Sequence, residues 1–168
     1  MLRLLDVGRA MRAWRAMSEF RSGPDRAHND PVSLGECIFC DIASGRSPAR
    51  FVYEDEGACA FLDIEPVRPG HLLVMPRAHI TDLSSELAVK GIAEMAQTLH
   101  RATSLLMDRL SAEGVSVFQS NGSAAGQTVD HLHFHVVPRF TADARLTVNW
   151  TPAQDAIESL DRTHALLS

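Results

Sequence analysis

The chain has 168 residues, of which 45% are hydrophobic and 22% are charged, and its formal net charge is −5. This length suits one compact domain with a tail, and the sequence has no apolar run long enough to span a membrane. The mild acidity argues against a polymeric nucleic acid as partner, because such binding needs a basic surface. Three cysteines are too few and too odd in number for a secreted disulfide framework, so we expect a cytoplasmic protein.

The N-terminal part differs in composition from the rest. Residues 1–30 contain six arginines and four acidic residues, which gives a net charge of +2 and leaves −7 for the remainder. An Arg-rich amphipathic start is compatible with a transit peptide, although Asp6 and Glu19 weaken that interpretation. The following segment, SGPDRAHNDPVSLG, has the composition of a linker. We therefore predict a flexible extension and linker over residues 1–35.

Residues 36–140 are predicted to form the folded domain. A short helix is expected in CIFCDIAS, before Gly45, and a long helix over residues 86–114, which Gly114 ends. In the long helix, apolar residues recur near helical spacing at Leu87, Ile92, Met95, Leu99, Leu106 and Leu110. Strands are expected on both sides of the acidic turn at 55–57 and at 71–77, 115–121 and 131–138. This order predicts an α+β domain whose antiparallel sheet is covered on one face, followed by a tail at 141–168 with a short helix from about Pro152.

The segment DHLHFHVVPR contains histidines at alternate positions. In a strand, His131, His133 and His135 share one face, while the apolar residues between them share the other and pack under the long helix. Three imidazoles in a row have no packing advantage over threonine or valine, so we interpret this face as a functional site. The histidines could act as metal ligands or could include a nucleophile.

The loop NGSAAGQTVD, which precedes the histidines, favours a nucleophile. It supplies polar side chains, and its glycines allow backbone N–H groups to approach an oxyanion. Apart from Asp130, it offers little that a metal ion prefers. A hydrolytic zinc site would also need a further ligand and an open position for water. We therefore predict a phosphate-binding loop beside the histidines.

The stretch GQTVDHLHFHVVPR resembles the motif of the histidine triad (HIT) superfamily of nucleotide hydrolases and transferases. The likeness extends over residues 37–140. His135 stands where the transferase branches carry glutamine, which points to a hydrolase. The CIFC and FLDIEPVRPGH segments are most similar to the bacterial Hint-like branch, whereas the VPR ending is shared with dinucleoside polyphosphate hydrolases of the Fhit type. The resemblance implies a HIT-like fold with a five-stranded sheet, which pairs into a ten-stranded sheet in a homodimer.

The resemblance also implies catalytic roles. His133 would attack the α-phosphorus of a nucleotide and form a nucleotidyl-histidine intermediate that water hydrolyses. His135 would hydrogen-bond the phosphoryl oxygens, and His131 would orient the nucleophile, partly through its backbone carbonyl. Thr128 stands where the family places a hydroxyl that donates to the leaving atom.

Further positions match the family's substrate-binding residues. Asp63 would accept hydrogen bonds from both ribose hydroxyls, as a carboxylate can. Asn121 and Gln127 would contact phosphate or the leaving group, and His71 would lie beside the triad. The base would be lined by Phe39, Phe61, Leu62 and Ile64. Trp150 resembles a tryptophan that shapes leaving-group specificity, although its spacing from the triad is longer here.

Cys37 and Cys40 form a C-x-x-C pair at the front of the domain. In the family such a pair commonly binds a structural zinc ion together with a histidine of the P-x-x-H-I segment, here His79, and with the first triad histidine, His131. Four such ligands close a tetrahedron, so the ion would have a structural role. If His131 binds zinc, it cannot also relay protons, and His133 remains as the nucleophile.

The resulting expectation is a hydrolase of purine nucleotides linked through the α-phosphate, either an AMP phosphoramidate or a dinucleoside polyphosphate, without a catalytic cofactor. Two alternatives stay open at this point. One is a nucleotide-binding interaction module with vestigial activity. The other is a metal-dependent hydrolase that uses the histidines as ligands.

Overall fold

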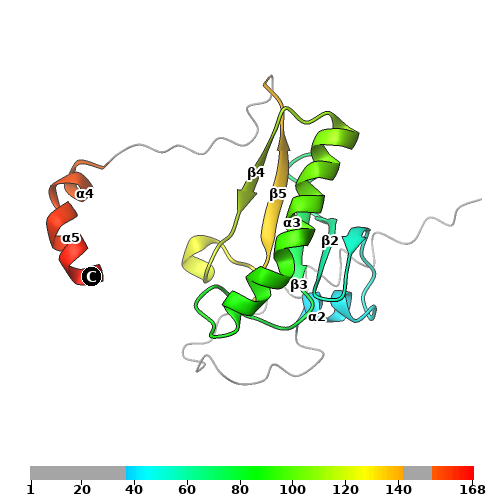
Figure 1. Ribbon diagram of the computed structural model, residues 1–168, viewed down its shortest axis with the longest axis horizontal. Coiled ribbons are helices and arrows are strands. Elements are labelled where there is room, and N and C mark those ends of the chain that lie inside the picture. Colours follow the sequence, from blue (N-terminus) through cyan, green and yellow to red (C-terminus); the bar gives the residue numbers. More distant parts are fainter. Residues whose placement is uncertain (1–36, 142–152) are drawn as a thin grey trace, which may run out of the picture.

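The computed structural model describes residues 37–141 and 153–168 (Figure 1). A sheet of five antiparallel strands in the order β1-β2-β3-β5-β4 forms its centre. The strands are β1 (Phe51–Glu54), β2 (Ala58–Leu62), β3 (Leu72–Pro76), β4 (Gly114–Phe118) and β5 (Phe134–Arg139). The helices are α2 (Ile38–Ala43), α3 (Ala88–Leu110), the 3-10 turn η1 (Ser123–Ala125), α4 (Gln154–Glu158) and α5 (Leu160–Leu167). The predicted α+β fold, with one long and one short helix against a five-stranded antiparallel sheet, is confirmed.

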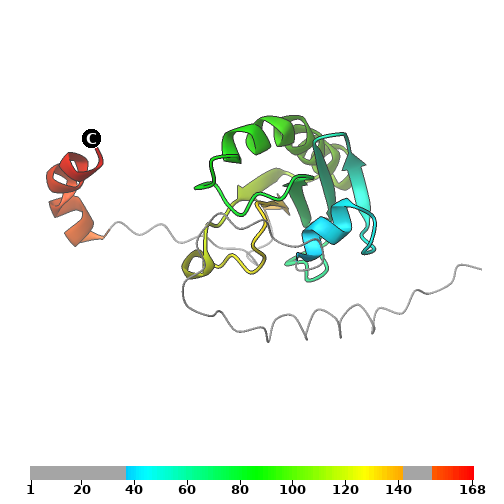
Figure 2. The ribbon, with the colours of Figure 1, turned by 90° about the horizontal axis from the view of Figure 1, so that it is seen from below.

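The two faces of the sheet carry different layers, as the perpendicular views of Figures 1 and 2 show. On one face, called here the α3 face, small and aliphatic residues pack with α3: Ala58, Ala60, Leu72 and Val74. On the opposite α2 face, the intervening residues pack with α2: Cys59, Phe61, Leu73 and Met75. This alternation follows from the two-residue period of a strand. It leaves α2 covering only one end of its face, beside the histidines.

Helix α3 is shorter than the sequence predicted, and its buried positions differ. It ends at Leu110, because Ser111 adopts a left-handed conformation with φ 53°, and Gly114 belongs to β4. Met95 and Leu106 are buried as expected, whereas three other residues of the predicted apolar row are exposed: Leu87, Ile92 and Leu110. Small residues make the contact instead, at Ala88, Gly91, Thr98 and Ala102. The helix comes so close that a Cβ on Gly91 would lie 2.4 Å from Cδ1 of Ile80.

Strand β5 also begins later than predicted. The ladder between β3 and β5 runs from Phe134, which pairs with Val74, to Val136, which pairs with Leu72. His131 to His133 therefore precede the strand, although alternation still holds: Leu132 and Val136 lie in the core under α3, with Phe134 packed against it. His135 pairs with Leu73, so its side chain shares the α2 face.

The C-terminal part contains two short helices, α4 and α5, where the sequence predicted one from about Pro152. In Figure 1 they are drawn apart from the sheet. The predicted extension and linker at 1–35 and Trp150 lie outside the described residues. Among the helices of residues 37–141 and 153–168, none combines the length and apolar character needed to cross a membrane.

Candidate functional site

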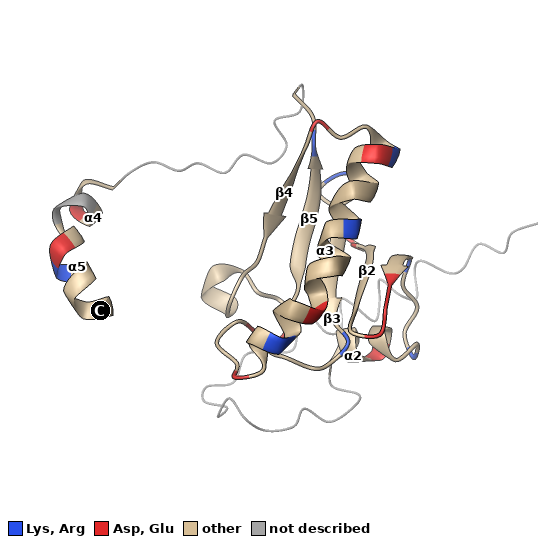
Figure 3. Ribbon diagram, viewed as in Figure 1, with Lys and Arg blue, Asp and Glu red and all other residues tan. Residues whose placement is uncertain are grey.

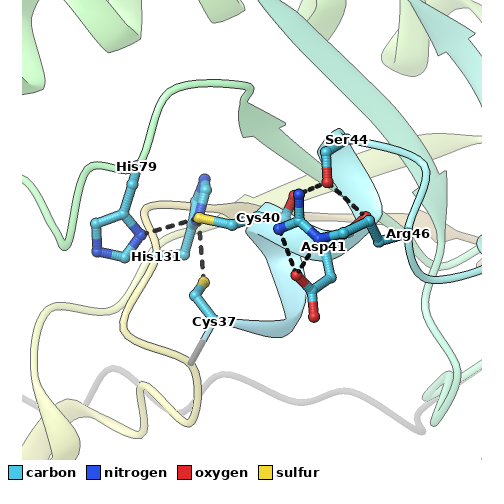
Figure 4. A network of polar contacts seen from close by, with 7 residues as sticks. All are labelled: Cys37, Cys40, Asp41, Ser44, Arg46, His79 and His131. Carbon is cyan, nitrogen blue, oxygen red and sulfur yellow. Dashed lines mark hydrogen bonds and ion pairs between the residues drawn. The ribbon is translucent and has the colours of Figure 1, made fainter. Parts of the chain in front are cut away.

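His131, the first histidine of the triad, belongs to a cluster with Cys37, Cys40 and His79 (Figure 4). We call these residues the Cys/His cluster. Nδ1 of His131 lies 3.5 Å from Sγ of Cys37 and 3.6 Å from Sγ of Cys40, which in turn lies 3.3 Å from Nδ1 of His79. Residues from α2, from the loop after β3 and from the segment before β5 thus converge on one point. The sequence placed these four residues in one predicted set, and the structure brings them together.

The geometry of the Cys/His cluster fits a tetrahedral zinc ion. Bonds of about 2.3 Å to sulfur and 2.0–2.1 Å to nitrogen place sulfur and nitrogen ligands roughly 3.6 Å apart. Nε2–H of His131 donates to the carbonyl oxygen of Pro76 at 2.9 Å, so the lone pair of Nδ1 faces the two sulfur atoms. Burial lowers the pKa of His131 to about 4, so its ring is neutral at pH 7. The donor set and its support fit a structural zinc ion.

His133 lies next to this cluster but faces elsewhere. Its Nδ1 is 2.6 Å from the carbonyl oxygen of His131, so Nδ1–H is the donor and Nε2 carries the lone pair. Its ring packs edge-on against Phe39, with centroids 5.2 Å apart. Burial lowers the pKa of His133, although the bond to His131 and the charge of Asp63 oppose this effect. A neutral, oriented imidazole with an available lone pair is suited to nucleophilic attack.

His135 is held by a chain of two hydrogen bonds. The backbone N–H of Val67 donates to Nδ1 of His71 at 3.3 Å, which leaves the ring proton of His71 on Nε2. Nε2 of His71 lies 2.9 Å from Nδ1 of His135 and therefore donates to it. Burial lowers the pKa of both rings, that of His135 to about 4. The chain leaves Nε2–H of His135 as a donor, which is what a phosphoryl oxygen requires.

Asp63 lies beside these two rings at the end of β2. Its Oδ1 accepts the backbone N–H of Glu65 at 2.9 Å. Its Oδ2 is 3.4 Å from Nδ1 of His71, but that nitrogen already accepts the N–H of Val67. Because the direction of a backbone N–H is fixed by its heavy atoms, we interpret His71 as neutral and the contact as one between two acceptors. Asp63 keeps lone pairs for a ligand.

The loop between β4 and β5 uses two of its predicted ligand-binding side chains to hold itself together. Oε1 of Gln127 accepts the N–H of Gly122, and its Nε2 donates to the carbonyl oxygens of Thr81 and Val129. Oδ1 of Asn121 accepts the N–H of Leu83 at 2.9 Å. Asn121 and Thr128 are exposed, whereas Gln127 is buried. Gln127 is thus a buried support of the loop, whereas the Thr128 hydroxyl is accessible.

Two of the predicted base-lining residues, Phe39 and Phe61, lie on the α2 face, whereas Leu62 pairs with Leu72 of the α3 face. Phe39 and Phe61 are buried and pack edge-on with centroids 5.8 Å apart, while Leu62 and Ile64 are exposed. The ring of Phe51, on β1, packs against Phe61 at 5.9 Å and remains 37% exposed. Partly exposed apolar side chains beside a carboxylate and histidines can bind a planar base.

Comparisons with known proteins show the family of this chain. A family model described as the HIT domain matches residues 44–142. The chain belongs to the HIT family. An adenosine 5'-monophosphoramidase of Schizosaccharomyces pombe is 36% identical over 114 residues, which cover 68% of this chain and 82% of that protein.

Solved HIT structures have the same fold. A HIT family member from Bacillus subtilis matches with a TM-score of 0.70 at 32% identity, covering 78% of this chain and 94% of that one. A zinc-bound histidine triad family protein from Mycobacterium smegmatis matches with a TM-score of 0.58 at 37% identity, with the same coverage. The fold predicted for this HIT protein therefore agrees with experimental structures of relatives.

Three groups in this HIT site were not found from the sequence: the carbonyl of Pro76, the amide of Val67 and the ring of Phe51. The first two are backbone groups, whose position depends on how the chain folds and not on residue type. Phe51 had a usable signal, because it stands at the start of a predicted strand opposite the strand that carries Phe61.

Proposed function

We propose that this protein hydrolyses purine nucleotides linked through their α-phosphate, with an AMP phosphoramidate as the preferred class ahead of dinucleoside polyphosphates. The observation that carries this proposal is the bond from Nδ1–H of His133 to the carbonyl oxygen of His131. It fixes one tautomer and turns the Nε2 lone pair outward as a nucleophile. The S. pombe relative, which is named an adenosine 5'-monophosphoramidase, supports the substrate class.

The proposed reaction has two steps. Nε2 of His133 attacks the α-phosphorus, the phosphorus–nitrogen bond of the substrate breaks, and the leaving amine takes up a proton. Water then attacks the same phosphorus, the bond to His133 breaks, and AMP leaves with a neutral imidazole restored. Thr128, accessible in the loop before the triad, donates its hydroxyl proton to the leaving atom in the first step, and the proton that the attacking water releases in the second step restores this hydroxyl. Positioning of this kind supplies most of the catalysis in phosphoryl transfer.

Charge on the phosphoryl oxygens is stabilised by His135. The chain from Val67 through His71 holds the proton of His135 on Nε2. Because His135 does not have to reorient when charge develops, its hydrogen bond strengthens in the transition state at little cost. Asp63 accepts the ribose hydroxyls, and the base lies against the aromatic residues of the α2 face. Gln127 supports the phosphate loop through the hydrogen bonds of its side chain to backbone groups of Gly122, Thr81 and Val129.

We further propose that the Cys/His cluster holds a structural zinc ion. The zinc-bound M. smegmatis relative supports this assignment. The ion would tie α2 to the loop after β3 and to the segment before β5, so its chemistry is cross-linking and not activation of water. Reduced thiols are required, which fits a cytoplasmic setting. The folded unit spans residues 36–140 in this proposal.

A homodimer is the proposed assembly. β4 is an edge strand of neutral residues, GVSVF, and Figure 3 shows it without a charged residue. Charged residues normally protect such an edge from pairing with another chain. On the neighbouring surface of α3, Met107 and Leu110 are 47% and 44% exposed, as is Val117 of β4 at 47%. Pairing of two β4 edges would give the ten-stranded sheet that the resemblance implies.

The test measures release of AMP from an adenosine phosphoramidate and from a diadenosine polyphosphate, with and without EDTA. We expect turnover that does not depend on added metal and that falls at least about 10⁴-fold in His133→Ala, as in other hydrolases that lose a nucleophile. His100→Ala, an exposed histidine of α3, serves as the matched control.

Two outcomes would contradict the proposal. Tight AMP binding without turnover would favour the interaction module. Turnover that EDTA removes at once, with the melting temperature unchanged, would favour the metal-dependent hydrolase. Among the described residues, however, the groups able to hold a metal ion divide the triad, with His131 in one and His135 in another.

A further inference from the structure

A second group of potential metal ligands lies on the other side of His133. It consists of Asp63, His71 and His135, whose ligand atoms lie within 4.8 Å of one another. We call it the Asp/His cluster. Oδ2 of Asp63 is 3.4 Å from Nδ1 of His71 and 3.8 Å from Nδ1 of His135. It shares no residue with the Cys/His cluster.

The hydrogen bonds fix both rings of this cluster as neutral, with Nδ1 unprotonated. Nδ1 of His71 accepts the N–H of Val67, and Nδ1 of His135 accepts Nε2–H of His71. Together with Oδ2 of Asp63, three atoms able to bind a metal lie within 4.8 Å of one another, and a metal ion would replace the two hydrogen bonds to the ring nitrogens. Two neutral imidazoles and a carboxylate form the donor set that divalent transition metals prefer when they bind on one side of an open site.

From this arrangement we infer that the Asp/His cluster binds a divalent transition-metal ion, of the Zn²⁺ or Ni²⁺ kind, as an inhibitor. The inference rests on the proposed function for its inhibitory part, but the binding of metal stands apart from any activity. It assigns a second metal site, distinct from the structural one, to residues that otherwise hold the nucleotide.

The structure indicates what must move. A metal ion with bonds of about 2.1 Å holds its ligand atoms roughly 3.0–3.4 Å apart. The 3.4 Å contact between Asp63 and His71 already has this spacing, whereas the 3.8 Å contact to His135 is longer. The His135 side chain is 34% exposed, so its ring has room to turn toward Asp63. In doing so it gives up the hydrogen bond from His71, and Nδ1 of His71 gives up the one from the N–H of Val67 when it binds the ion.

Inhibition follows from the loss of that bond and from competition. Once His135 is a metal ligand, its Nε2–H no longer points where the chain from Val67 directs it. Asp63 is engaged at the same time and cannot accept the ribose hydroxyls. Metal and nucleotide therefore exclude each other, and the ion acts as a competitive inhibitor.

The experiment uses the full chain with zinc already bound at the Cys/His cluster. NiCl₂ is titrated by calorimetry, because Ni²⁺ prefers oxygen and imidazole ligands to a tetrahedral thiolate site. We expect one Ni²⁺ per chain, competition by AMP, and a loss of affinity of at least about tenfold in Asp63→Asn and in His135→Gln, since removing a ligand costs no less than removing its outer partner. The matched control His100→Gln should bind Ni²⁺ like the wild type.

Circular dichroism of each variant shows that the fold is intact. The inference is overturned if Ni²⁺ binds equally well to Asp63→Asn and His135→Gln, if it does not bind at all, or if AMP leaves its affinity unchanged. The two proposals fail separately. A protein that turns over no nucleotide yet binds Ni²⁺ at these residues refutes only the proposed function. Turnover without Ni²⁺ binding refutes only this inference.

Discussion

His131 and His135 are four residues apart in the same motif, yet they lie in opposite surroundings. The ring of His131 is fully buried, its Nδ1 faces two cysteines and its Nε2–H is bound to a backbone carbonyl. The side chain of His135 is 34% exposed, and its Nδ1 accepts a hydrogen bond from Nε2–H of His71. Residue type and strand face are the same for both. Their neighbours, contributed by distant parts of the chain, differ, and on that basis we propose that one histidine stabilises the fold and the other contacts the ligand.

Replacing Cys37 and Cys40, the neighbours of the buried His131, should have the largest effect on stability. In Cys37→Ser with Cys40→Ser, the cross-link between α2 and the triad segment is lost. We expect about 3 kcal/mol or more of stability to disappear and the melting temperature to fall by roughly 10 °C or more. Thermal unfolding with zinc added checks this. Cys59→Ala, at a buried cysteine outside the cluster, is the control, and an equal fall there would refute a special role for the pair.

His135→Gln should lower activity and leave stability almost unchanged, the reverse of the cysteine variant. Loss of a preorganised donor to the developing charge lowers kcat by about 10²-fold. The melting temperature should stay within a few degrees of the wild type, because the side chain is partly exposed and outside the Cys/His cluster. Steady-state kinetics and thermal unfolding measured on the same preparation test both halves. A variant that unfolds at a lower temperature but keeps its kcat would show that His135 serves stability and not catalysis.

Asp63→Asn tests the ligand side with a smaller effect. An amide accepts only with its oxygen and carries no charge, so the bonds to the ribose hydroxyls weaken. Bonds to a charged group are worth about 1.5–3 kcal/mol, which corresponds to a rise in KM of roughly 10- to 100-fold. A 2'-deoxy substrate should show the same loss in the wild type and little further loss in the variant. An unchanged KM would remove Asp63 from the nucleoside site.

The smallest effect is expected from pH. Attack needs neutral His133, and burial holds the pKa of this histidine below its usual 6.5. The value of kcat/KM should therefore stay flat from pH 8 to about 6.5 and decline only at lower pH, as protonation removes the lone pair. A pH–rate profile with an acid limb centred above 6.5 would show that the bond to His131 outweighs burial.

The sequence predicted the layers of the fold and, through the family resemblance, the composition of the Cys/His cluster, but it did not predict the grouping of Asp63, His71 and His135. The histidine alternation and the C-x-x-C pair are local patterns, and they located His131 and His133 correctly with respect to the core. Contacts between distant parts of the chain could not be predicted in this way. The side chain of Gln127 bonds backbone groups of Thr81 and Val129, and Asn121 accepts the N–H of Leu83 but stays exposed, so their contact with phosphate stays a prediction. Leu110 fits the apolar row of α3, yet it is 44% exposed, and its side chain lies over Gly70 at the far end of the helix from Gly91.

The late start of β5 has a consequence for anyone who would build such a site into a new protein. The carbonyl of His131 lies ahead of the ladder that begins at Phe134, and it accepts Nδ1–H of His133, the proposed nucleophile, instead of a partner strand's amide. A designer who copied HLHFH into an ideal, fully paired strand would keep every side chain. The carbonyl of the first histidine would then accept a backbone N–H of the neighbouring strand. The transplanted His133 would then lack a fixed tautomer. A usable template must include the unpaired residues in front of the strand as well as the histidines themselves.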